Sequence, residues 1–94
     1  MIKIKKLSEN AALPRYAKPG DAGMAFYSNE ELTILPNERK LVSTGISMAI
    51  PEGYVGLIWD KSGIATKHGI KTMAGVIDSG YRGEVKILVH NLSD

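Results

Sequence analysis

Two short segments of the sequence contain residue types that could bind phosphate or activate water. The first, residues 60–65, directly follows an apolar stretch. Within it, Lys61 offers a positive charge, Ser62 an O–H donor, and Gly63 a backbone N–H that a phosphate oxygen can approach without meeting a Cβ atom. This combination predicts a phosphate-binding loop, although an ordinary turn at the end of a strand would use the same residues.

The second segment contains Asp78 and Tyr81, at the tip of what reads as a β-hairpin. Asp78 follows the apolar residues Val76 and Ile77, so we expect its carboxylate to be partly desolvated and suited to act as a general base toward water. Tyr81 could lay its ring against a sugar. The alternative is a plain Asp-Ser-Gly turn in which the Asp78 side chain bonds its own backbone.

The elements that must position these segments are predicted to be β-strands, because apolar residues alternate with polar ones along them. The alternating sets are Leu32 and Ile34; Val42, Ile46, Met48 and Ile50; Val55, Leu57 and Trp59; and Val85, Ile87 and Val89. Turn residues separate the strands at Pro19-Gly20, Asn29-Glu30, Pro36-Asn37, Pro51-Glu52-Gly53 and Ser79-Gly80. Only residues 62–69 could form a short helix. We therefore expect an all-β sandwich, jelly roll or barrel, since one open sheet would leave a face and two edges uncovered.

Composition restricts the possible functions. The length of 94 residues fits a single domain, residues 1–94. A formal charge of +2 lacks the concentrated basic face that duplex binding needs, so we expect no nucleic-acid partner. The absence of Cys removes disulfides and thiolate metal sites. No stretch reaches membrane-spanning length, and the first six residues alternate charged and apolar groups, unlike a signal peptide. We expect no membrane partner and a cytoplasmic location.

Four conspicuous residues receive no catalytic role. His68 and His90 are isolated from other metal-ligating side chains, so we expect them to be surface or packed residues. Trp59, which shares its predicted strand with Val55 and Leu57, is expected in the core or in an interface. Asp60 is expected to serve the turn that follows it.

Four segments together resemble successive motifs of the trimeric dUTPases (dUTP diphosphatases) in their order and spacing. They are Pro19-Gly20-Asp21-Ala22-Gly23-Met24-Ala25-Phe26; Lys61-Ser62-Gly63; Lys67-His68-Gly69-Ile70; and the run from Gly75 through Asp78 and Tyr81 to Glu84. The likeness extends roughly from residue 19 to residue 91. It implies the jelly-roll-like, distorted β-barrel of that family and a homotrimer whose three clefts lie between subunits.

The resemblance also implies a reaction, in which water attacks the α-phosphorus of dUTP and releases dUMP and pyrophosphate, with Mg²⁺ carried on the triphosphate. Asp78 would hold and deprotonate the water. Ser62 and the Gly63 amide would contact phosphate oxygens. Lys61 stands where the family usually has Arg, which keeps the charge but loses the planar bidentate fork.

Base and sugar recognition would come from the second segment. By resemblance, Tyr81 would pack on the deoxyribose and leave no room for a ribose 2′-hydroxyl. Backbone groups around Gly75, Val76 and Lys86 would read the uracil edge as a pairing base does, and the closeness of the hairpin would exclude a 5-methyl group.

The sequence departs from the family pattern in two places. The family usually has an Asp where this chain has Ala25, and Asp21 would lie about 13 Å away along an extended strand. The chain stops at Asp94, where family members continue into further strands and a glycine-rich tail, so the resemblance predicts a C-terminally truncated relative. The alternative to a working diphosphatase is therefore a catalytically impaired, truncated or engineered scaffold that at most binds deoxyuridine nucleotide. A third possibility is an assembly module that binds a partner through exposed sheet edges.

Overall fold

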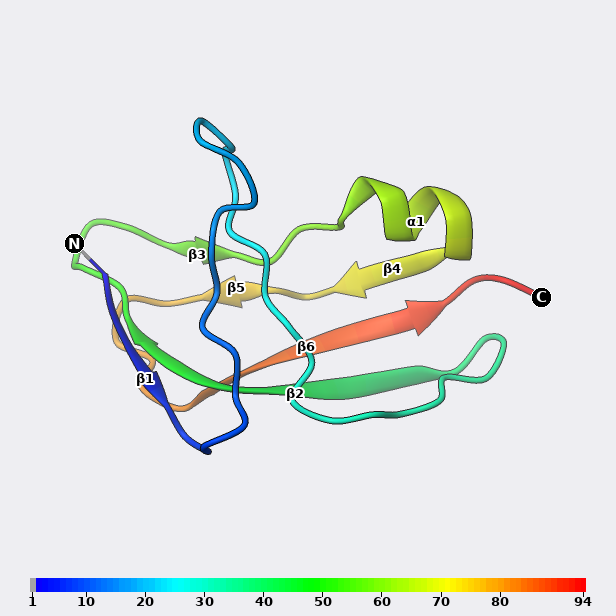
Figure 1. Cartoon of the computed structure of the whole chain (residues 1–94), viewed down its shortest axis with the longest axis horizontal. Coiled ribbons are helices and arrows are strands. Elements are labelled where there is room, and N and C mark those ends of the chain that lie inside the picture. The colour runs from blue at the N-terminus through cyan, green and yellow to red at the C-terminus, as the bar shows by residue number, and fades with distance from the viewer. Residues whose placement is uncertain (1) are drawn as a thin grey trace.

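The computed structural model describes residues 2–94, whose strands form two antiparallel sheets (Figure 1). The larger sheet contains, in spatial order, β1 (Lys3–Lys6), β2 (Arg39–Ala49), β6 (Glu84–Asn91) and β4 (Ile70–Met73). The smaller sheet pairs β3 (Gly56–Leu57) with β5 (Val76–Ile77). The prediction of an all-β fold is confirmed.

The core lies between the long strands and the irregular N-terminal third of the chain. Ile46, Met48 and Ile50 from the β2 region and Val85 from β6 form one buried cluster with Ala11. Alternate residues of a strand point to the same face, and three members of the predicted β2 set meet one member of the predicted β6 set in this cluster.

A bulge interrupts the alternation of β2. Three residues of β2 separate its pairs Ser43↔Lys86 and Ser47↔Glu84, whereas β6 has one residue in the same interval. Gly45, inside the bulge, has a φ of +69°, a conformation that glycine adopts at little cost. An added Cβ there would also lie 2.8 Å from the Ala11 Cβ. The bulge therefore requires glycine at this position.

The predicted helix is confirmed as α1 (Ser62–His68). It ends at Gly69, whose left-handed φ of +66° lets its N–H donate to the Ala65 carbonyl at 3.0 Å. Lys67 and His68 lie in the last turn, where positive charge is favoured by the helix dipole. No helix within residues 2–94 is long and apolar enough to cross a membrane.

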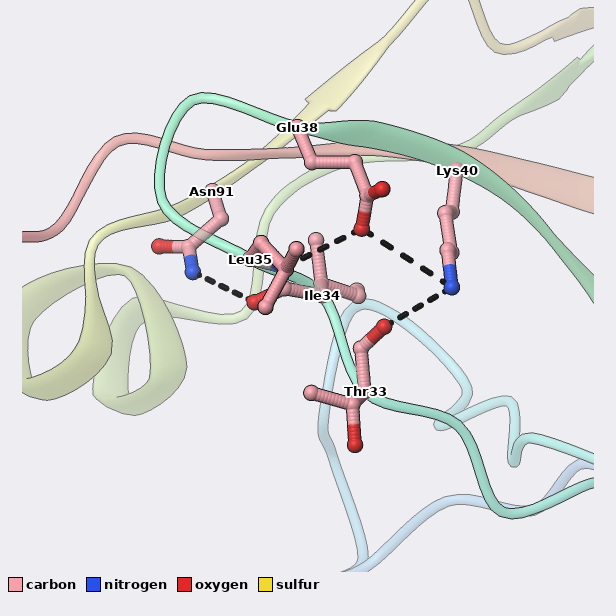
Figure 2. A network of polar contacts seen from close by, with 6 residues as sticks. All are labelled: Thr33, Ile34, Leu35, Glu38, Lys40 and Asn91. Carbon is pink, nitrogen blue, oxygen red and sulfur yellow. Dashed lines mark hydrogen bonds and ion pairs between the residues drawn. The ribbon is translucent and has the colours of Figure 1, made fainter.

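The segment around Leu32 and Ile34, predicted as a strand, is irregular. Its backbone groups bond side chains from β2 and β6 instead of a neighbouring strand (Figure 2). Asn91 Nδ2 donates to the Ile34 carbonyl at 2.8 Å, and Lys40 Nζ donates to the Thr33 carbonyl at 2.8 Å. The strand prediction was wrong, because these carbonyl groups bond side chains of β2 and β6 and not the backbone of a neighbouring strand.

The strand predicted through Val55, Leu57 and Trp59 is reduced to the two residues of β3. All three side chains are exposed, and Trp59 keeps 80% of its surface accessible. Val76, which pairs with Leu57 on β5, is 67% exposed. Trp59 is therefore not a core residue of this chain, and its place in an interface stays a prediction. We call the surface formed by Val55, Leu57, Trp59 and Val76 the β3–β5 apolar face.

Candidate functional site

The predicted hairpin opens into a gap before its tip. β4 and β6 pair from Ile70↔Asn91 to Met73↔Leu88, and the ladder ends there. Ala74 and Gly75 then adopt positive φ values of 56° and 96°. At this kink the chain stops pairing with β6. It continues as β5, which lies beside β3 (Figure 1). The predicted hairpin is therefore present between β4 and β6, but its two arms separate before the tip, where β5 pairs with β3.

Gly75 permits this change of partner. Its carbonyl accepts a hydrogen bond from the Ile58 N–H at 2.9 Å, which extends the β3–β5 pairing by one residue. A Cβ on Gly75 would lie 2.9 Å from the Ile58 carbonyl oxygen, closer than side-chain carbons approach. The carbonyl of Gly75 therefore already accepts one hydrogen bond within the chain, on the β3 side.

The backbone of Lys86 faces the gap. In an antiparallel ladder, the N–H and C=O of successive residues point alternately to the two neighbouring strands. Asn91 exchanges hydrogen bonds with Asn37 and Glu38 on the β2 side, whereas the Leu92 N–H donates to the Gly69 carbonyl on the opposite side. The bulge lies in β2 and leaves the alternation of β6 intact. Even-numbered residues of β6, Lys86 among them, therefore direct their backbone groups away from β2.

Val76 faces the same gap from the other arm. The Gly75 carbonyl bonds Ile58 on the β3 side, so the backbone groups of the following residue point away from β3. The N–H and C=O groups of Val76 and Lys86 therefore border the gap from opposite arms. Each arm offers both a donor and an acceptor to a planar ligand.

A tight turn closes the arms at Asp78 and Tyr81. The Tyr81 N–H donates to the Asp78 carbonyl at 3.1 Å, and Arg82 Nη1 donates to the Ser79 carbonyl at 2.5 Å. Asp78 is exposed, and its carboxylate makes no hydrogen bond to residues 2–94. The expected partial desolvation of Asp78 is not found within one chain, nor does its carboxylate bond its own backbone. The carboxylate is free to accept a proton from a bound water.

Tyr81 lies over Gly83 and is held by its hydroxyl. The Tyr81 Oη–H donates to the Glu84 carbonyl at 2.6 Å. A Cβ on Gly83 would lie 2.7 Å from that hydroxyl oxygen, so the phenol needs a glycine there. The ring remains 46% exposed. It therefore offers an ordered, accessible aromatic surface beside the gap.

Glu84 is a residue of this region to which the sequence assigned no role. Its carboxylate accepts hydrogen bonds from the Ser43 hydroxyl and from the Gly45 N–H, the latter at 2.8 Å. The bond from Ser43 first, and that from Gly45 second, lower the pKa of Glu84 below its usual value. No local signal marks this role, because it depends on the register between β2 and β6.

The predicted phosphate-binding residues lie at the start of α1. Lys61 is the extended residue before the helix, with φ −89° and ψ 119°, and its carbonyl accepts the Ala65 N–H at 2.9 Å. The N–H groups of Ser62 and Gly63 precede that first helical hydrogen bond, so the helix provides no acceptor for them. Together with the exposed Lys61 side chain, they can donate to an anion.

Asp60 fixes the start of this segment to β4. Its carboxylate accepts from Lys71 Nζ at 2.6 Å and from the N–H and hydroxyl of Thr72, each at 2.7 Å. These bonds, that from Lys71 foremost, lower the pKa of Asp60 to about 2. These bonds all go to β4 and none goes to the turn that follows Asp60, so its expected role in that turn stays a prediction.

One chain does not bring the two predicted segments together. α1 lies beside β4, whereas the turn between β5 and β6 lies at the opposite end of the sheet, near β1 (Figure 1). Thr72, which Asp60 contacts, lies in β4, and Asp78 follows β5, beyond the kink at Ala74 and Gly75. Within one chain, the predicted phosphate-binding segment and the turn after β5 therefore lie toward different ends of the sheet.

Ala25 lies in a two-residue bridge with Arg15. The Ala25 N–H donates to the Arg15 carbonyl at 2.8 Å, while Met24 and Phe26 pack against the core. The carboxylate of Asp21 accepts the Lys18 N–H at 2.9 Å and so serves the turn at the tip of this arm. Residues 2–94 contain no group of three His, Cys, Asp or Glu side chains that could hold a metal ion.

Known proteins resemble the chain over nearly its whole length. A sequence model of the dUTPase family matches residues 9–94. The deoxyuridine 5′-triphosphate nucleotidohydrolase of Clostridium kluyveri is 46% identical over 91 residues, which cover 95% of this chain and 64% of that protein. The corresponding protein of Thermobifida fusca is 42% identical over 92 residues, covering 96% of this chain and 51% of its own length. The chain thus spans about half to two-thirds of the length of these relatives.

Solved structures show the same similarity. The dUTPase from phage phi11 of S. aureus superposes with a TM-score of 0.95 at 35% identity, covering 100% of this chain and 61% of the phage protein. A mutant of the phi11 enzyme, described as revealing the coordination of a structural Mg(II) ion, has a TM-score of 0.93 at 35% identity, with 99% and 61% covered. The structural similarity therefore covers the whole described chain and not only the order of its strands.

Proposed function

The chain belongs to the dUTPase family, and from this premise we propose that it hydrolyses dUTP to dUMP and pyrophosphate. The observation that carries the proposal is the gap between Val76 and Lys86, directly beside the turn of Asp78 and Tyr81. The region contains backbone donors and acceptors that would bind a base, an aromatic ring that would contact a sugar, and a carboxylate that would bind water.

The gap suits uracil because its edge alternates acceptor, donor and acceptor groups. The backbone N–H groups of Val76 and Lys86 would donate to uracil oxygens, and a carbonyl would accept from the uracil N3–H. Backbone groups held by β3 and β2 cannot rearrange freely, so recognition would be preorganised. The Gly75 carbonyl is not included in this set, because it is directed toward Ile58 on the β3 side.

Asp78 would act as the general base. Its carboxylate would take a proton from a water that attacks the α-phosphorus, while the bond from that phosphorus to the oxygen bridging the α- and β-phosphates breaks and pyrophosphate leaves. Tyr81, held by the Glu84 carbonyl, would pack against the deoxyribose and leave no space for a 2′-hydroxyl. The ring would thereby also fix the distance between the sugar and the turn.

A complete site would use more than one subunit. Lys61, Ser62 and Gly63 stand at the start of α1, beside β4, whereas the turn after β5 lies toward the other end of the sheet (Figure 1). We therefore propose a homo-oligomer, a trimer by its family, in which the phosphate-binding segment of one subunit faces the Asp78 turn of another. Burial by that neighbour would also supply the desolvation of Asp78 that one chain lacks.

Mg²⁺ would reach the site on the nucleotide. Residues 2–94 of one chain offer no group of three metal-ligating side chains, and the Ala25 side chain carries no oxygen. Mg²⁺ in such a site would neutralise charge on the triphosphate, and its ligands would be phosphate oxygens and water. The roles assigned above to Asp78, Tyr81 and Ser62 do not depend on a protein-bound metal.

Pyrophosphate release from dUTP in the presence of Mg²⁺ tests the proposal. We expect Asp78→Asn to lower kcat by about 100- to 10,000-fold, the usual contribution of a general base, while dUMP binding persists. Glu9→Gln, which makes the same chemical change at an exposed acid elsewhere, is the matched control and should retain full activity. A protein that binds dUMP but releases no pyrophosphate would be a binding module, and one that does neither would refute the proposal.

A further inference from the structure

Glu84 joins the core strand β2 to the turn that carries Tyr81. Its carboxylate accepts hydrogen bonds from the Ser43 hydroxyl and the Gly45 N–H, both on β2. Its backbone carbonyl accepts the Tyr81 hydroxyl at 2.6 Å. One residue therefore makes contacts on both sides of β6 at the point where the strand begins.

The bulge in β2 makes this carboxylate necessary. Ladder pairing stops between Ser43↔Lys86 and Ser47↔Glu84, so the intervening backbone groups need other partners. Thr44 Oγ1 donates to the Val85 carbonyl at 2.6 Å, but the Gly45 N–H has the Glu84 carboxylate as its partner. Without that carboxylate, the Gly45 N–H and the Ser43 hydroxyl would both lose an acceptor at a half-buried site.

The same contacts determine where the first residues of β6 lie. Lys86 pairs with Ser43, and Glu84 bonds the hydroxyl of that same Ser43. The β4 ladder ends at Leu88 and therefore does not hold residues 84–87 from the other side. The position of the Lys86 backbone beside the gap, and that of the carbonyl that holds Tyr81, both depend on the carboxylate.

We infer that Glu84 is a positioning residue that sets the selectivity for deoxyribose over ribose by fixing the Tyr81 ring through its backbone carbonyl. This inference rests on the proposed function, in which Tyr81 packs on the sugar. Glu84 itself does not touch the nucleotide, since its carboxylate is directed into the β2 bulge. Its effect on selectivity is exerted through the position of Tyr81.

Calorimetric titration of the full chain with dUMP and with UMP tests the inference. The ratio of the two dissociation constants measures selectivity for the sugar. We expect Glu84→Ala to reduce that ratio at least tenfold. Glu84→Gln, which keeps one acceptor oxygen, should reduce it less and provides a milder variant if the alanine variant fails to fold. Asn91→Ala, at the other end of β6, is the control, since it destabilises the same strand but should leave the ratio unchanged.

A double-mutant cycle separates positioning from a general loss of stability. Tyr81→Phe removes the hydroxyl that the Glu84 carbonyl holds and keeps the ring. If Glu84 acts through Tyr81, the double variant Glu84→Ala/Tyr81→Phe should lose no more selectivity than the worse single variant. Additive losses would overturn the inference. Unchanged selectivity in both Glu84 variants would also overturn the inference and would leave the proposed function intact. A wild-type protein that binds no dUMP would refute the inference and the proposed function together.

Discussion

Gly75 lies where the chain stops pairing with β6 and begins to pair with β3. Replacing Gly75 by alanine should destabilise the fold by two separable effects. The first is conformational. The φ of Gly75 is +96°, and a residue with a Cβ pays about 1–2 kcal/mol for a left-handed conformation. The second is steric, because the added methyl group would lie 2.9 Å from the Ile58 carbonyl oxygen and 3.1 Å from the Ile58 Cβ. Relief of such overlap costs about 1–3 kcal/mol in a packed region.

Gly53 provides a control for the first effect alone. Its φ is +90°, close to that of Gly75, but a Cβ there would meet no atom within 4 Å. Gly53→Ala should therefore cost only the conformational term, about 1–2 kcal/mol. Gly75→Ala should cost about 2–5 kcal/mol, the sum of the two terms. The difference between the variants measures how closely β5 is held against Ile58.

Urea denaturation at one fixed protein concentration gives both values, since concentration affects the apparent stability of an oligomer. Titration with dUMP on the same samples shows whether the kink matters for the gap. We expect weaker dUMP binding for Gly75→Ala and wild-type binding for Gly53→Ala. Equal destabilisation by the two substitutions would refute the close contact with Ile58, and equal dUMP binding would refute the link between the kink and the base site.

Three further predictions concern the stability of the fold. The folded-state pKa of Asp60, about 2, lies below its ordinary value of 3.8. The stability that Asp60 contributes is therefore complete above about pH 4 and is lost as the pH falls through 2. Urea midpoints between pH 5 and pH 2 should decline less steeply for Asp60→Asn than for the wild-type protein. Asn91→Ala removes the buried amide that bonds Ile34 and Ser93, and urea denaturation should show a loss of about 1–3 kcal/mol. Ile46→Ala, at a side chain with no exposed surface, should cost about 2–5 kcal/mol in the same assay, whereas a truncation of the exposed Leu41 should stay within about 0.5 kcal/mol.

Local sequence patterns were sufficient to predict the long strands and the helix. The apolar alternation along Val42, Ile46 and Met48 survives the bulge because the bulge adds two residues to β2 and so leaves the parity unchanged. The helix at 62–68 is followed by Gly69, whose type suits the left-handed conformation found there, whereas Lys61 before it provides no side-chain cap. The organisation as a single domain and the cytoplasmic location stay predictions.

Features that depend on strand register could not be read from the sequence. The gap at Val76 and Lys86 arises because β5 pairs with β3, which no local pattern around residue 75 specifies. The role of Glu84 depends on its position opposite the β2 bulge. The motif spacing nevertheless placed Asp78 and Tyr81 in one turn, where the Tyr81 N–H bonds the Asp78 carbonyl. The expected partial burial of Asp78 is not found in this chain, and in the proposed homo-oligomer a neighbouring subunit would supply it.

The β3–β5 apolar face gives this protein a natural optical reporter. Trp59 is the sole tryptophan of the sequence, and most of its indole surface is in contact with water. Any molecule that covers this face would transfer the indole from a polar to an apolar environment and shift its emission to shorter wavelength. Dilution series followed by tryptophan fluorescence would therefore monitor subunit association without an added dye, and an emission maximum that does not change with dilution would mean that the face stays in the same environment.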